Sequence, residues 1–421
     1  MHMLSAVHYI FNRAKHLAEN YYKDDKTEIP TVINFSYGWS GGRHDGQDYL
    51  EAAIGELIDA RRQIAPTAIV MPSGNVFDEN LHGIINCQDF KNNQYEFGWQ
   101  LQPDDRTSSY LEIWFPDDTD DEDFTICLSH PFKFAADDVI EIVLKHNIQR
   151  TPDIKRRFDV ISINGKIIGQ ISVDKHRDTR WRCLIALAPT SISGNSSAGA
   201  NAAPAGKWKI NIVKKANGVK STKAIHCYVQ RDDDPAIFKT DGRQSRLVDF
   251  KSPPVNPNPI ATSKIKKGFV QNFGTLSGVS NHNSTTLVAG FDAVTNKPAD
   301  YSSAGNISNI IEDKKVNISA ILERSPSQQC VLAAGVKSRS LSILNGTSSA
   351  APLVTRELAK KFYKLAPTLV QAQMATNYVG LFEEKIASAI SESDGIFNKG
   401  NDENITRLGN FLLSRSYIYQ P

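Results

Sequence analysis

The chain has 421 residues, enough for two or three domains, and its 48 basic and 46 acidic side chains leave a formal net charge of +2. This balance does not indicate a nucleic-acid partner or an anionic membrane surface, and no stretch has the roughly 18 consecutive apolar residues of a membrane span. The 5 cysteines form no Cys-x-x-Cys pair and the 10 histidines show no metal-ligand spacing, so we expect no metal ion and no other cofactor.

The N-terminal part alternates helical and strand patterns. A helical pattern at residues 4–21 is followed by a strand pattern at 31–36, a second helical pattern at 50–58 and an apolar run at 68–71. Strand, helix and strand in this order form a βαβ unit, which implies a parallel sheet covered by helices. Residues 1–20 do not resemble a signal peptide. The sequence therefore does not fix the cellular compartment, and we slightly favour the cytoplasm.

The middle of the chain has a different pattern, in which short period-2 runs are separated by polar turns. We expect eight strands there, at 110–114, 124–128, 139–144, 160–163, 167–173, 183–187, 208–213 and 225–229. Asn164-Gly165 between two of these runs predicts a two-residue hairpin turn. The segment therefore predicts a β-sandwich or jelly roll inserted into the α/β domain, with a packing role or a binding role left open.

The α/β pattern resumes after a proline-rich linker at 252–259. It comprises a strand pattern at 285–291, apolar runs at 316–321 and 330–334, and helical patterns at 353–365 and 368–389. The predicted fold class is α/β, a doubly wound and mostly parallel sheet with the inserted sandwich. The predicted domains are a first α/β part at 1–89, the sandwich at 90–235, a second α/β part at 236–395 and a tail at 396–421.

Residues 345–352 read Asn-Gly-Thr-Ser-Ser-Ala-Ala-Pro and lead into a helical pattern. Gly346 permits a tight turn, and Pro352 is tolerated in a first helical turn, where amide hydrogens have no intrahelical partner. Ser348 therefore lies at a helix N-terminus, where free N–H groups and the helix dipole favour negative charge. From these residues alone, a nucleophilic serine and a closely packed helix start both remain open.

The pattern Gly346-Thr347-Ser348-x-Ala-x-Pro352 resembles the nucleophile motif of the subtilases, the subtilisin-like serine peptidases. Residues 34–38 are similar to the family strand that pairs with the extended substrate, and residues 73–75 to the turn that supplies the oxyanion asparagine. The resemblance implies a polypeptide substrate and peptide-bond hydrolysis, with Ser348 as nucleophile and Asn75 as oxyanion donor. It also implies substrate contacts from Ser36, Tyr37, Gly38, Ser73 and Gly74.

The family segments that carry the catalytic aspartate and histidine, Asp-Thr/Ser-Gly and His-Gly-Thr-His, do not occur in this sequence. His2, His8 and His16 lie on or beside the opening helix, and His44-Asp45 belong to a loop on the substrate side. Either an upstream or separate segment supplies the two residues to a serine endopeptidase, or the chain is a catalytically inactive binding or scaffold protein. A third alternative, a carbohydrate-binding module on an inert support, rests on the sandwich alone.

Overall fold

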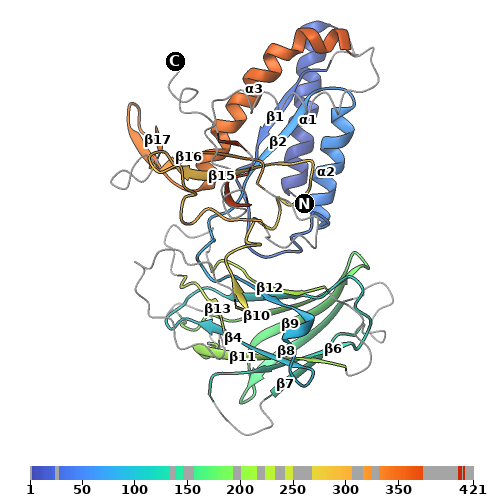
Figure 1. Ribbon diagram of the computed structural model, residues 1–421, viewed down its shortest axis with the longest axis vertical. Helices are drawn as coiled ribbons and strands as arrows, with labels where there is room; N and C mark the ends of the chain where they lie inside the picture. Colours follow the sequence, from blue (N-terminus) through green and yellow to red (C-terminus); the bar gives the residue numbers. More distant parts are fainter. Residues whose placement is uncertain are drawn as a thin grey trace. The chain divides into compact units, whose positions relative to one another are not determined.

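The chain divides into two compact units (Figure 1). Unit 1 comprises Met1–Trp39, Arg43–Phe77 and Phe273–Pro421, and unit 2 comprises Ser40–Gly42 and Asp78–Asn272. The structure is a computed structural model, and it describes residues 2–23, 28–132, 139–145, 156–192, 201–215, 223–232, 242–249, 268–305, 316–323, 331–372, 406–409 and 411–412. None of the helices in these ranges is long and apolar enough to cross a membrane.

Unit 1 is built on a five-stranded parallel sheet. In spatial order its strands are β1 (Thr31–Asn34), β2 (Thr67–Pro72), β15 (Thr286–Asp292), β16 (Ile318–Glu323) and β19 (Phe411–Leu412). Helices α1 (His2–Tyr22) and α2 (Tyr49–Arg62) pack on one face of this sheet, and α3 (Thr347–Ala372) packs on the other. Because successive side chains of a strand point to opposite faces, Ile69 and Met71 join the α1 and α2 core, whereas Ala68 and Val70 join the α3 core.

Local signals explain where the helices that flank the site begin. Asp48 caps α2, because its carboxylate accepts the N–H of Leu50 at 3.0 Å.

Helix α3 follows a separate antiparallel hairpin of β17 (Val331–Ala334) and β18 (Leu341–Leu344). The two helical patterns expected at 353–365 and 368–389 are replaced by one helix that begins at Thr347 and reaches Ala372. Residues 373–389 of the second pattern and the linker at 252–259 lie outside the described residues.

Unit 2 contains two antiparallel sheets. The seven-stranded sheet has the order β14 (Val270–Gln271), β3 (His82–Ile85), β12 (Ile225–Val229), β5 (Ser109–Trp114), β10 (Arg180–Leu187), β9 (Lys166–His176) and β8 (Arg156–Ile163). The five-stranded sheet has the order β13 (Arg246–Val248), β4 (Gln94–Leu101), β11 (Gly206–Lys214), β6 (Phe124–Ser129) and β7 (Val139–Val143). A short 3-10 helix spans Cys87–Asp89.

Aromatic side chains fill the space between the two sheets of unit 2. The ring centroids of Phe97 and Phe269 are 4.6 Å apart, and those of Phe115 and Phe124 are 5.0 Å apart. Trp99 and Trp208 face each other on neighbouring strands and are both fully buried. Burial of such large rings contributes much of the hydrophobic stabilisation of a sandwich core.

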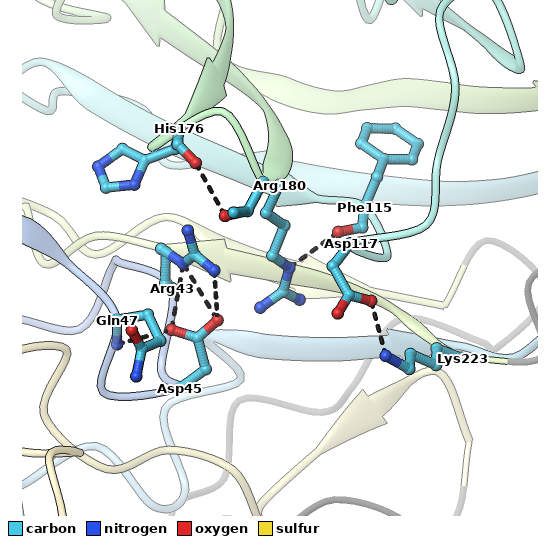
Figure 2. A network of polar contacts seen from close by, with 9 residues as sticks. Arg43, Asp45, Gln47, Phe115, Asp117, His176, Arg180 and Lys223 are labelled. Carbon is cyan, nitrogen blue, oxygen red and sulfur yellow. Dashed lines mark hydrogen bonds and ion pairs between the residues drawn. The ribbon is translucent and has the colours of Figure 1, made fainter.

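Polar contacts of unit 2 tie the residues after β5 to the start of β10 and to the segment before β12, and Figure 2 shows them. Arg180 Nε, at the start of β10, donates to the carbonyl oxygen of Phe115 at 2.8 Å. Lys223 Nζ lies 2.7 Å from Asp117 Oδ1, and this hydrogen-bonded ion pair lowers the pKa of Asp117. The chain that leaves β5 is thus held on both sides, although such exposed ion pairs contribute little stability.

The expected fold class is wrong for this chain, which is mostly β rather than a doubly wound α/β fold. Within the described residues, twelve strands belong to the two large antiparallel sheets and five to the parallel sheet. The βαβ pattern of the N-terminal part dominated the prediction, but a parallel sheet grows only where a crossover helix or long connection follows each strand. Most strands of unit 2 instead pair antiparallel, some across short turns such as β8 with β9 and many with strands distant in sequence, such as β4 with β11 and β5 with β12. The jelly-roll topology stays a prediction.

Candidate active site

The turn before α3 requires a glycine. Gly346 follows β18 with a φ of +91°, a conformation that residues with a side chain rarely adopt. A Cβ at this position would lie 3.0 Å from Asn75 Nδ2. The N–H of Gly346 donates to the Tyr301 hydroxyl at 3.1 Å, which anchors the turn. A larger residue would therefore disturb the turn and the Asn75 amide together.

Ser348 is the second residue of α3 and is partly exposed. Its carbonyl oxygen accepts from Ser36 Oγ at 3.1 Å, whereas neither its N–H nor its hydroxyl has a hydrogen-bond partner among the described residues. N–H groups of a first helical turn have no intrahelical acceptor, and this end of the helix dipole is positive. Ser348 thus combines an accessible hydroxyl with an N–H group that can stabilise an anion.

Asn75 is oriented by Thr347, the residue before Ser348. Asn75 Oδ1 accepts from the N–H of Thr347 at 2.8 Å and from its Oγ1 at 3.0 Å. The amide group must therefore present its Nδ2 end elsewhere, and Nδ2 has no acceptor in the part of the chain that the structure describes. Gly74 N–H donates in turn to Thr347 Oγ1 at 3.1 Å. The amide Nδ2 of Asn75 and the N–H of Ser348 are thus two unused donors at one helix end.

The turn that carries Asn75 is held by backbone contacts on both sides. Ser73 N–H donates to the carbonyl of Val288 at 2.8 Å, and the carbonyl of Ser73 accepts from the N–H of Ser277 at 2.8 Å. Ser303 N–H donates to the carbonyl of Gly74 at 3.0 Å. Neighbouring segments therefore fix both residues of this turn that the resemblance assigns to substrate contact.

The segment assigned to the substrate strand follows β1. Ser36, Tyr37 and Gly38 are exposed and lie beyond the end of the strand, which the sequence pattern extended to residue 36. The Oγ of Ser36 connects this segment to Ser348, as described above, and the ring of Tyr37 packs edge-on against Trp39 at 6.1 Å. The structure therefore brings the segment beside the start of α3, with Tyr37 49% exposed.

The histidine and aspartate of the substrate-side loop are not brought to Ser348 by any described contact. Arg43 Nη2 and Nε donate to Asp45 Oδ2 at 2.9 and 3.0 Å, and Asp45 Oδ1 accepts the N–H of Gln47 at 3.0 Å (Figure 2). These contacts make Asp45 a structural anchor of its own loop. No described histidine, aspartate or glutamate side chain hydrogen-bonds Ser348, and no three such side chains or cysteines group into a metal site there.

Sequence reasoning missed two residues that shape the site. Thr347 was visible inside the Gly-Thr-Ser motif, but its role in orienting Asn75 depends on a contact across 272 residues. Ser277, whose N–H bonds to the Ser73 carbonyl, lies in a segment without any motif. Only these tertiary contacts reveal the two residues.

Comparison with solved structures finds a similar fold in the CspB protease of Clostridium perfringens. The TM-score is 0.62 at 14% sequence identity, over 100% of this chain and 72% of that chain. Neither a protein-family model nor a curated protein sequence matches the chain. At this identity the similarity concerns the fold, so the resemblance to the subtilases stays a prediction.

Proposed function

We propose that the protein is a serine endopeptidase with subtilase-like acyl-enzyme chemistry, Ser348 as nucleophile and a polypeptide as substrate. The observation that carries the proposal is a pair of unused donors at the start of α3, the Ser348 N–H and the Nδ2 of Asn75, whose amide group Thr347 orients. A pair of preorganised donors beside a serine hydroxyl is the arrangement that acyl transfer requires. The fold similarity to a protease is consistent with it.

The proposed chemistry places negative charge where these donors point. When Ser348 Oγ attacks a peptide carbonyl carbon, the carbonyl oxygen becomes an oxyanion, and both donors hydrogen-bond it. In subtilisin, loss of one such donor lowers kcat about 10²- to 10³-fold. The positive end of the α3 dipole acts in the same direction. Ser36, Tyr37 and Gly38 would pair with the extended substrate by strand addition, because they lie exposed beside Ser348.

The proposal also requires a base for the Ser348 proton. An upstream or separate segment would supply the histidine and the aspartate that orients it, since no described side chain takes this role. We therefore expect the chain alone to react slowly and to accelerate when that segment is present.

A fluorophosphonate probe tests the assignment of the nucleophile. We expect slow labelling of the chain, no labelling of Ser348→Ala, and unchanged labelling of Ser349→Ala, a matched control whose Oγ donates to the Asn345 carbonyl at 3.1 Å. A polypeptide that contains the Asp and His motifs should raise the labelling rate of the parent chain. Equal labelling of the parent and Ser348→Ala would exclude Ser348, and peptide binding without labelling under any condition would favour the inactive binding protein.

A further inference from the structure

A buried glutamate of unit 1 is connected by hydrogen bonds to the candidate active site. Glu51, in the first turn of α2, is 1% exposed, and its Oε1 accepts from the N–H and the Nδ2 of Asn281 at 2.7 and 3.1 Å. Its other oxygen, Oε2, is buried without a partner in the described part of the chain. Fully buried glutamates without a cation are rare in proteins because the ionised form loses its hydration.

Hydrogen bonds lead from Glu51 to the turn that carries Asn75. Asn281 Nδ2 also donates to the carbonyl of Ser277 at 2.8 Å, and the N–H of Ser277 donates to the carbonyl of Ser73 at 2.8 Å. Ser277 in addition packs so closely against Gly38 that a Cβ on Gly38 would overlap the serine hydroxyl. One segment, residues 277–281, therefore contacts both the Ser73–Gly74 turn and the substrate-side segment.

We propose that Glu51 is a positioning residue. It holds Asn281 and Ser277 in place, and these two residues in turn fix the positions of the Ser73–Gly74 turn and of Gly38 in the candidate active site. The consequence for Ser348 rests on the proposed function. The hydrogen-bond chain itself does not depend on it.

The surroundings of Glu51 favour a neutral carboxyl group. Asp45 and Asp48 precede it at the start of α2, and the facing segment contributes neutral Asn281, followed by His282, whose ring lies against Gly55. The positive end of the α2 dipole favours ionisation, but burial outweighs it and raises the pKa of Glu51 to about 8. Ionisation would leave a charge on unpartnered Oε2, so we infer that the segment at 277–281 is held most firmly while Glu51 is protonated and loosens as Glu51 ionises.

Hydrogen exchange of the Ser277 and Gly278 amides tests this link directly. Both N–H groups are bonded within unit 1, to the carbonyls of Ser73 and Trp39. In Glu51→Leu we expect exchange of both amides to rise at least tenfold while amides of β15 and β16 change less than twofold. Glu56→Gln, which alters an exposed carboxylate of the same helix, is the matched control and should leave all these rates unchanged. A uniform rise across unit 1, or no rise at Ser277, would overturn the positioning role.

Glu51→Gln separates the role of protonation from loss of folding. Glutamine keeps an acceptor for Asn281 and stays neutral, so below pH 4.5 its exchange rates, corrected for intrinsic pH dependence, should match those of the parent chain, and the two should diverge as the pH rises. At pH 9 a group with a pKa near 8 is about 90% ionised, and there the parent chain should exchange at least tenfold faster at Ser277 than Glu51→Gln. Superimposable profiles from pH 6 to 9.5 would refute the protonation dependence.

Labelling by the fluorophosphonate probe distinguishes this inference from the proposed function. If Glu51→Leu slows labelling of Ser348 and Glu51→Gln is labelled at the rate of the parent chain, the positioning role and the proposed function are both supported. If no form is labelled but the exchange response is present, the proposed chemistry fails and the positional link remains. If labelling is normal in every variant, Glu51 does not position the site.

Discussion

Replacing Glu51 by glutamine should stabilise unit 1 at neutral pH, although it alters a hydrogen-bonded acid. Burial raises the pKa of Glu51 from 4.5 to about 8 in the folded chain. The folded protein therefore holds this proton more tightly than the unfolded chain does. The stability that this proton provides is fully present below about pH 4.5 and is lost as the pH rises through 8.

The pKa values set the size of the effect. One pKa unit corresponds to about 1.36 kcal/mol, so keeping Glu51 protonated in the folded state at pH 7 reduces the free energy of unfolding by about 3 kcal/mol. At pH 5 the reduction is below about 1 kcal/mol. Glutamine never ionises and keeps an acceptor for Asn281. The advantage of Glu51→Gln over the parent chain should thus grow by about 1 kcal/mol per pH unit between pH 5 and pH 8.

Urea unfolding followed by circular dichroism at 222 nm measures this difference, because α1, α2 and α3 all belong to unit 1. The transition of unit 1 should be fitted separately, since a chain of two units need not unfold in one step. Glu56→Gln serves as the control and should show the pH dependence of the parent chain. A difference between Glu51→Gln and the parent that is the same at pH 5 and pH 7 would refute the reasoning.

Further substitutions test the site and unit 2. Asn75→Asp keeps the acceptor for Thr347 and should change the free energy of unfolding by less than about 1 kcal/mol in urea titrations. Asn75→Ala leaves the N–H and the hydroxyl of Thr347 unpaired, so it should lower the free energy of unfolding by about 1–3 kcal/mol. Gly346→Ala should lower it by about 1–3 kcal/mol, because of the positive φ and the 3.0 Å approach to the Asn75 amide; unchanged stability would contradict this strain. In unit 2, burial raises the pKa of Asp232 from 3.8 to about 6. The stability that the proton on Asp232 provides is therefore fully present below pH 3.8 and is lost as the pH rises past 6. Asp232→Asn should therefore raise the free energy of unfolding by about 2–3 kcal/mol at pH 7 but not at pH 3.5, as measured by fluorescence of the buried tryptophans of that unit.

Local structure followed closely from sequence patterns. The run at 225–229 is β12 with the same bounds, and the helical pattern at 4–21 is α1. The hairpin turn predicted at Asn164-Gly165 is confirmed, since β8 and β9 pair on either side of it and both residues have positive φ, 50° and 73°. These features depend on neighbours in the sequence, which a pattern can show.

Some elements were missed for identifiable reasons. The strand β4 (Gln94–Leu101) has the alternation of Tyr95, Phe97, Trp99 and Leu101, and its period-2 signal was available. The two-residue strand β19 lies in the tail, where no pattern was expected, and it forms only by pairing with β16. The fold class was wrong because the balance of parallel and antiparallel pairing depends on all connections together.

The sequence by itself determined many of the elements, such as α1, β12 and the β8–β9 turn, and the residue types at the start of α3. The tertiary structure alone decided which donors of Asn75 and Ser348 are left unpaired, because Thr347 meets Asn75 across 272 residues of sequence. It also decided that Glu51 is buried, through a contact with Asn281 that spans 230 residues. Hydrogen-bond partners and burial are properties of contacts between distant segments, and no local pattern of side chains encodes them.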